Sequence, residues 1–110
     1  MPARSEIQYA AVAAATLGDN TLVAAVAGKR IRVHSLVLLA SGGANTVRLE
    51  SAAGGTALTG QMDIIDNGQL VLPHNPAGWC ETAAGELLNL ELSAATAVAG
   101  LLTYSEVQTI

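Results

Sequence analysis

Hydrophobic and polar residues alternate along much of this chain with a period of two, which is typical of a β-strand with one buried face. The longest such segment runs from Lys29 to Ala40. One face of this strand would carry Ile31, Val33, Ser35, Val37 and Leu39, and the other Arg30, Arg32, His34, Leu36 and Leu38. The second face changes from polar to apolar halfway, so we expect the strand to run from an exposed rim into a covered region.

Shorter segments of the same kind follow, separated by turn residues. Thr46–Glu50 alternates cleanly, and Leu87–Leu92 places three leucines on one face. Between them, Asn67-Gly68 favours a tight hairpin turn, because both residues tolerate a positive φ. The pattern predicts about eight short strands, spaced roughly 8 to 12 residues apart.

This spacing predicts an all-β fold, an antiparallel β-sandwich, and turns of unequal length favour a jelly roll over an even up-and-down arrangement. We expect a single domain, with an Ala-rich N-terminal arm and first strands at residues 1–28 and a sandwich body at residues 29–110. The segment Glu6–Thr16 stays ambiguous. Its alanines favour a helix, whereas Ile7 and Tyr9 alternate with polar residues as in a strand.

The composition indicates a thin hydrophobic core. Hydrophobic residues make up 51% of the chain, but Tyr9, Trp79 and Tyr104 are its only aromatic residues and many of the others are alanines. We therefore expect Trp79, together with Tyr104, to plug a core otherwise made of Leu, Val and Ala. A thin core also suggests completion by a partner, and the simplest partner is another copy of the chain.

The charge distribution limits the partners. A net charge of −4 argues against direct binding to nucleic acid, where a basic face is expected. All five Lys and Arg residues precede residue 49, so that part carries +3 and residues 49–110 carry −7. This segregation suits an oriented contact with a charged surface, or simply two solvated faces of different sign. No stretch has the length of a membrane span, so we expect no membrane partner.

The sequence offers little for catalysis, and we do not expect an enzyme, a metal or a cofactor. Cys80 has His74 and Glu81 nearby, but a buried inert thiol is far commoner than a catalytic one. His34 and His74 form no spaced ligand pair, so we expect rim or loop histidines without a ligand role. Residues 63–68 lack the alternating oxygen ligands of a calcium loop and instead suit a hairpin turn.

Several segments between residues 29 and 107 carry a resemblance to a known family. They are the strands KRIRVHSLVLLA and TVRLES, the loop LVLPHNPAGWCET, and the C-terminal segments GELLNLELS and VAGLLTYSEV. With these segments, the chain resembles the head decoration, or cement, proteins of tailed bacteriophages. That family consists of jelly-roll trimers on the capsid exterior.

The resemblance implies a virion structural protein, made in the host cytoplasm, that binds the major capsid protein as a homotrimer and stabilises the shell. The cations Arg4, Lys29, Arg30 and Arg32 are then candidates for contact with an acidic capsid surface. A phage tail or fibre component is an alternative. A carbohydrate-binding β-sandwich module is another, because Trp79 could serve as a sugar platform beside the loop of residues 74–78.

Overall fold

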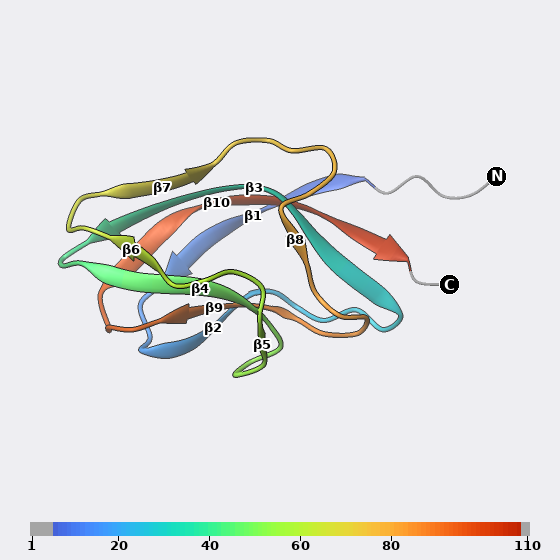
Figure 1. Ribbon diagram of the computed structural model, residues 1–110, viewed down its shortest axis with the longest axis horizontal. Helices are drawn as coiled ribbons and strands as arrows, with labels where there is room; N and C mark the ends of the chain where they lie inside the picture. The colour runs from blue at the N-terminus through green and yellow to red at the C-terminus, as the bar shows by residue number, and fades with distance from the viewer. Residues whose placement is uncertain (1–5, 109–110) are drawn as a thin grey trace.

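The protein folds into two antiparallel sheets packed face to face (Figure 1). The computed structural model describes residues 6–108, so the predicted arm at residues 1–5, which includes Arg4, lies outside the described residues. The strands are β1 (Ile7–Ala14), β2 (Gly18–Val23), β3 (Lys29–Ser41), β4 (Asn45–Ser51), β5 (Thr56–Ala57), β6 (Met62–Ile64), β7 (Gln69–Leu72), β8 (Cys80–Glu81), β9 (Leu88–Leu92) and β10 (Ala97–Gln108). Two of these ten strands, β5 and β8, have only two residues, which accounts for the excess over the predicted number.

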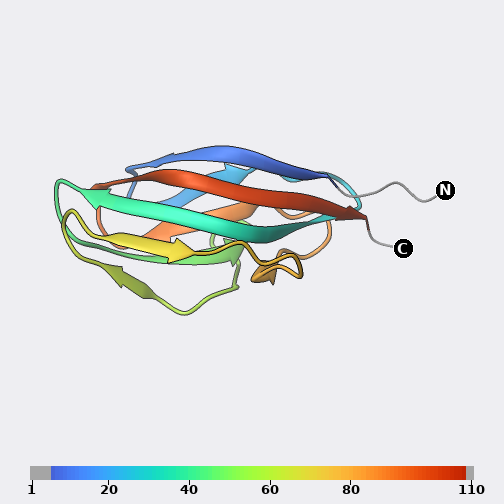
Figure 2. The same ribbon diagram turned by 90° about the horizontal axis from the view of Figure 1, so that it is seen from above.

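The strand order is that of a jelly roll. One sheet, here called sheet A, has the order β1-β10-β3-β7, with β8 also pairing with β3 (Figure 2). The other, sheet B, has the order β2-β9-β4, with both β5 and β6 pairing with β4. The first and last strands are neighbours, and successive long strands alternate between the sheets, as in two interlocked Greek keys. The predicted all-β sandwich is therefore confirmed.

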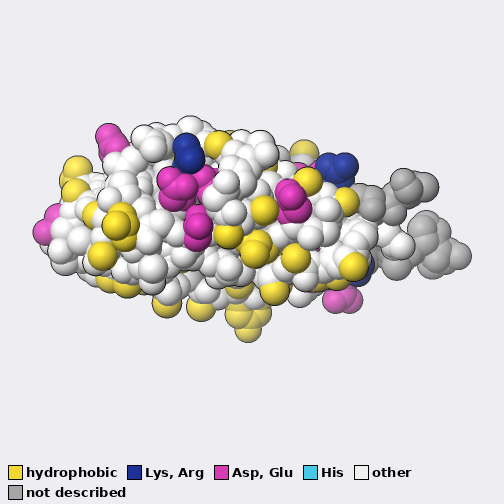
Figure 3. All heavy atoms as spheres, turned by 90° about the horizontal axis from the view of Figure 1, so that it is seen from below, with side chains coloured by type: hydrophobic (Ala, Val, Ile, Leu, Met, Phe, Trp, Pro, Cys, Tyr) yellow, Lys and Arg dark blue, Asp and Glu magenta, His cyan; other side chains and the backbone are white. Residues whose placement is uncertain are grey.

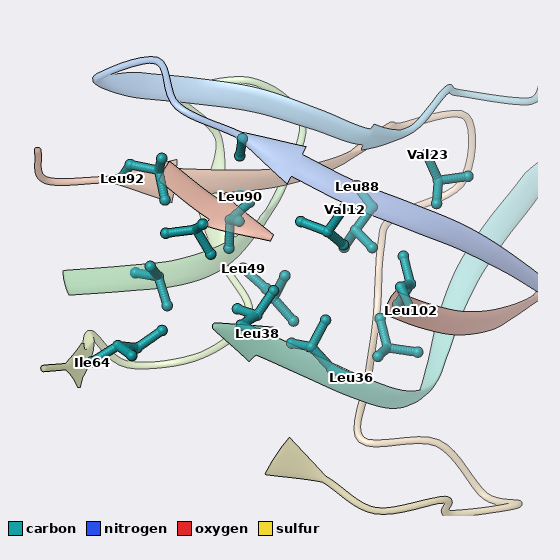
Figure 4. Packing of buried hydrophobic residues seen from close by; sticks show 14 of the residues in the cluster. Val12, Val23, Leu36, Leu38, Leu49, Ile64, Leu88, Leu90, Leu92 and Leu102 are labelled. Carbon is teal, nitrogen blue, oxygen red and sulfur yellow. The ribbon is translucent and has the colours of Figure 1, made fainter. Parts of the chain in front are cut away.

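Aliphatic side chains from both sheets fill the space between them (Figure 4). The buried hydrophobic residues are Val12, Ala14, Val23, Ile31, Val33, Leu36, Leu38, Ala40, Val47, Leu49, Ile64, Leu88, Leu90, Leu92, Val98 and Leu102. They include Leu88, Leu90 and Leu92, which were predicted to lie on one face of a strand. The core is built from Leu, Val, Ile and Ala, as the composition indicated.

The prediction that Trp79 plugs this core is wrong. Trp79 is 46% exposed, and its indole Nε1–H donates a hydrogen bond of 2.7 Å to the carbonyl oxygen of Pro73. The alternating aliphatic residues of the two sheets already fill the interior, so the indole lies on the loop that precedes β8. Tyr104 is partly buried and packs against the core, and its hydroxyl bonds to Gln8.

A β-bulge in β3 changes which residues of this strand face the core. Thr103 of β10 pairs with Ser35, but the next residue, Tyr104, pairs with Val33, so His34 is the extra residue. An extra residue reverses the alternation beyond it. The inward-facing side chains are therefore Ile31 and Val33 before the bulge, and Leu36, Leu38 and Ala40 after it. The expected single face from Ile31 to Leu39 is wrong, because the bulge interrupts the period of two.

The ambiguous Ala-rich segment is a strand. β1 pairs with β10 along its entire length, from Ile7 opposite Ser105 to Ala14 opposite Val98. Val12 and Ala14 point into the core, so the register with β10 outweighs the helical preference of alanine. Within residues 6–108, no helix is long and apolar enough to cross a membrane.

Candidate functional site

The side of sheet A that points away from the core is charged before the β-bulge, where it carries Arg30 and Arg32 of β3 and Glu81 of β8, and uncharged beyond it. Its outward positions beyond the bulge, here called the outer face, are Tyr9, Ala11, Ala13, Ser35, Val37, Leu39, Ser41, Gln69, Val71, Ala97, Ala99, Leu101 and Thr103. None of these side chains is an acid, a lysine, an arginine or a histidine. The outer face therefore presents methyl groups and a few hydroxyls, with one amide.

The register of the strands places apolar side chains in rows across this face. Ala11, Leu101, Val37 and Val71 are opposite one another on the four strands. Leu101 is 45% exposed, Val71 52% and Tyr9 77%. β1, β10 and β3 lie about 4.8 Å apart and pair over about seven residues that rise about 3.3 Å each, whereas β7 pairs over four, which gives a face of roughly 400 Å². Apolar surfaces of this kind are common where proteins contact a partner.

The predicted cations Lys29, Arg30 and Arg32 lie together at the start of β3, and each is paired with a carboxylate. Lys29 lies 3.5 Å from Glu106, Arg30 lies 3.9 Å from Glu81, and the Arg32 Nε–H bonds to Glu81 at 2.8 Å. These three cations and two acids leave a net charge of +1 at this end of the sheet. The cationic patch is therefore weaker than the sequence indicated.

A second charged group lies on the outward side of sheet B, where Figure 3 shows acidic side chains beside a basic one. The Arg48 Nε–H donates to Glu50 at 2.7 Å, and Arg48 also lies 3.4 Å from Glu91. The Asn89 amide donates to both Asp19 and Glu50, each at 2.8 Å. Glu50 and Asn89 are fully buried, although both point away from the core.

The turn after β4 explains this burial. The backbone N–H of Gly54 donates to the Asp19 carboxylate at 3.1 Å, so the turn folds back across sheet B as far as β2. This cluster was not predicted from the sequence. The available signal was the alternation of opposite charges at Arg48 and Glu50 on one strand face.

The carboxylates of Asp19, Glu50 and Glu91 place ligand atoms within 4.8 Å of one another, as a cation site would. However, Arg48 and Asn89 already bond to these oxygens and supply the positive charge and the N–H donors. Each carboxylate of the cluster has a hydrogen-bond donor, although the single guanidinium balances only one of the three negative charges, and a cation would have to displace these donors.

The two glutamates in this cluster titrate in opposite directions. Desolvation opposes ionisation of Glu50, but hydrogen bonds with Glu91, Arg48 and Asn89 outweigh it and lower the Glu50 pKa. The hydrogen bond with Glu50, followed by desolvation, raises the pKa of Glu91. Two neighbouring carboxylates cannot both ionise at equal cost, so the buried Glu50 holds the charge.

We expect Glu50→Gln to lower the free energy of unfolding at pH 7 and Glu91→Gln to raise it. A lowered pKa means that ionised Glu50 stabilises the fold above the unfolded value near 4.5, and this contribution is lost as the pH falls. A raised pKa means that Glu91 favours the fold below that value, and this contribution is lost as the pH rises. Urea unfolding of both variants at pH 7 and low salt measures the difference. Equal losses of stability would contradict this assignment.

Cys80 and His34, considered above for catalysis and for metal binding, both lie in contact with the loop between β7 and β8. Desolvation raises the pKa of Cys80 to about 11, the opposite of the shift that activates a thiol. His34 is buried, not on a rim as expected, because the bulge and the loop between β7 and β8 enclose it. Its Nδ1–H donates to the carbonyl oxygen of Asn75 at 2.9 Å, and its Nε2 lies 2.8 Å from Ser105 Oγ. Since Ser105 is also buried, this pair fixes the loop to the sheet and presents no hydroxyl to a substrate.

Comparisons with known proteins gave matches among solved structures. No protein-family model and no curated protein matches the chain. Among solved structures, the chain is similar to one from a virus-like particle of the extra small virus of the giant freshwater prawn Macrobrachium rosenbergii. The sequence identity is 16%, the alignment covers 93% of this chain and 78% of that one, and the TM-score is 0.43. The jelly-roll assignment rests on the strand order of this chain itself.

Proposed function

We propose that this protein is a virion structural protein, a homotrimeric decoration protein that binds the major capsid protein on the outer face of a phage head. The observation that carries the proposal is the uncharged apolar outer face of sheet A. The resemblance of residues 29–107 to cement proteins supports the same role. Such a protein needs a surface for copies of itself and a second surface for the shell.

The outer face suits contact between copies of this chain because it avoids their shared negative charge. Each chain carries −4, so two copies approach with least repulsion where acids are absent. The projected area of roughly 400 Å² is about half of the ~800 Å² that each partner buries in a standard interface, and side-chain relief adds to the accessible area. The alanines on β1 and β10 also allow close approach of two backbones.

The end of sheet A that carries Lys29, Arg30 and Arg32 is the candidate surface for the capsid. It keeps a net charge of +1 while the whole chain is acidic. An acidic shell surface would therefore orient the protein with this end toward it.

Replacing Lys29, Arg30 and Arg32 by Glu should weaken binding to undecorated capsids by at least about tenfold. Three exposed charge contacts contribute about 0.5 kcal/mol each, and 1.4 kcal/mol is tenfold. A control chain with Glu at the exposed positions Thr56, Gln61 and Ala95 also becomes more acidic but keeps the cationic end. Cosedimentation with capsids measures both chains, and unchanged binding of the first variant would refute the electrostatic contact. Binding of the wild type to tails instead of heads would identify a tail or fibre component.

A further inference from the structure

The loop between β7 and β8 forms a rigid support for the one exposed tryptophan. The Trp79 backbone N–H donates to the Val33 carbonyl at 2.7 Å, and the Asn75 N–H donates to the His34 carbonyl at 2.9 Å. These bonds attach the loop to β3 at two points. Because the indole N–H is bound to Pro73, the ring is held in one orientation, and its apolar face is the part left for a ligand.

A hollow of about 180 Å³ lies beside this ring. Its lining consists of Arg32, Ala77, Gly78, Trp79, Cys80 and Glu81. The loop leaves β7 at the edge of sheet A and does not cross the strands β3, β10 and β1 (Figure 2). The hollow is smaller than the ~300 Å³ at which pockets for drug-sized ligands begin, so it suits one small unit of a larger ligand.

The polar wall of the hollow supplies hydrogen-bond donors and acceptors together. The Arg32 Nε–H bonds to Glu81 Oε1 at 2.8 Å, and both side chains stay about one-third exposed. An arginine has five N–H donors and a carboxylate has about four acceptor sites, so this single bond leaves further capacity on both groups. The pair is neutral overall, which favours an uncharged, hydroxyl-rich ligand over a phosphate or another anion.

Gly78 allows the loop to approach Arg32 this closely. Its φ is +87°, and a Cβ at this position would overlap Cγ of Arg32 and lie 2.7 Å from Cδ. Any other residue would strain the backbone and push the arginine side chain away from the hollow. The local geometry therefore places the indole, the guanidinium and the carboxylate around one space.

We propose that this hollow binds a sugar unit of a glycan, whose C–H face would pack on the Trp79 ring and whose hydroxyls would bond to Arg32 and Glu81. An apolar ring beside a paired donor and acceptor matches the two faces of a pyranose. The hollow lies outside the outer face, so glycan binding does not depend on the proposed trimer. It shares Arg32 with the candidate capsid surface, so glycan binding is measured on the free chain without capsids.

A glycan array probed with the full chain, followed by titration of the best-bound oligosaccharide, tests the proposal. Trp79→Ala should weaken binding at least about tenfold, whereas Trp79→Phe should retain part of it through its own aromatic face. Ile65→Ala, which removes another exposed large side chain, should bind as the wild type does. Circular dichroism and the oligomeric state of each variant establish that the fold and the assembly are intact.

Binding of no array glycan by the wild type would overturn the proposal, as would equal glycan binding by a folded Trp79→Ala variant. Either result would leave capsid binding and self-association to be judged by their own measurements. Arg32→Lys provides a second check without altering the loop that carries the indole, since it keeps the positive charge but removes the Nε–H that bonds to Glu81 and should also weaken glycan binding.

Discussion

Replacing Gly100 by Ala should destabilise the protein by more than about 4 kcal/mol, enough to lower the melting temperature by roughly 20 °C. Gly100 lies in β10 between its partners Val12 in β1 and Leu38 in β3. A Cβ at this position would overlap the carbonyl oxygen of Val37 and lie 2.7 Å from its carbonyl carbon. These are backbone atoms of a central strand, so relief requires β10 and β3 to move apart.

Gly60→Ala is the matched control for this prediction. A Cβ at Gly60 has no heavy atom within 4 Å, so the same chemical change should alter the free energy of unfolding by less than about 0.5 kcal/mol. Thermal unfolding followed by circular dichroism compares the two variants directly. If both melt at the temperature of the wild type, the close approach of β10 to β3 at Gly100 is wrong.

Replacing Leu101 by Lys should dissociate the proposed trimer into folded monomers. Leu101 lies in the apolar row with Ala11, Val37 and Val71, near the middle of the outer face. A lysine there would be desolvated without a carboxylate on the same face to pair with, which is costly at an interface. The monomer should keep its fold, because Leu101 is already partly exposed and points away from the core.

Leu17→Lys is the control for a non-specific effect of placing a lysine at an exposed leucine. Leu17 is 62% exposed, more than Leu101, but lies in the turn between β1 and β2. The same substitution there should leave the oligomeric state unchanged. Size-exclusion chromatography with light scattering at matched concentrations measures both variants. Dissociation by both, or by neither, would place the association somewhere other than the outer face.

The period of two in the hydrophobic pattern was sufficient to predict the all-β fold class. Leu88, Leu90 and Leu92 recur at every second position and are all buried, because a strand alternates its side chains strictly. The same rule failed in β3, where His34 adds a residue to one strand only. A bulge depends on the pairing of two strands, and a pattern read along one of them contains no signal for it.

The candidate surfaces were less predictable than the core. Trp79 has the size of a core residue. Its burial depends on whether the aliphatic side chains leave a space between the two sheets, and the sequence alone does not show this. Glu50 is buried because a turn folds over it to reach Asp19. The outer face could be recognised only from the register of the strands, which places the small and apolar residues of four strands on one side of sheet A. These three features depend on contacts between segments that are far apart in the chain.

The mass of the wild-type protein in solution tests the central claim, self-association through the outer face, most directly. Sedimentation equilibrium or native mass spectrometry at micromolar concentrations should give three copies of the 11.1-kDa chain. A single copy over the whole concentration range would contradict the account, because the uncharged outer face of sheet A would then be stable in water without a partner.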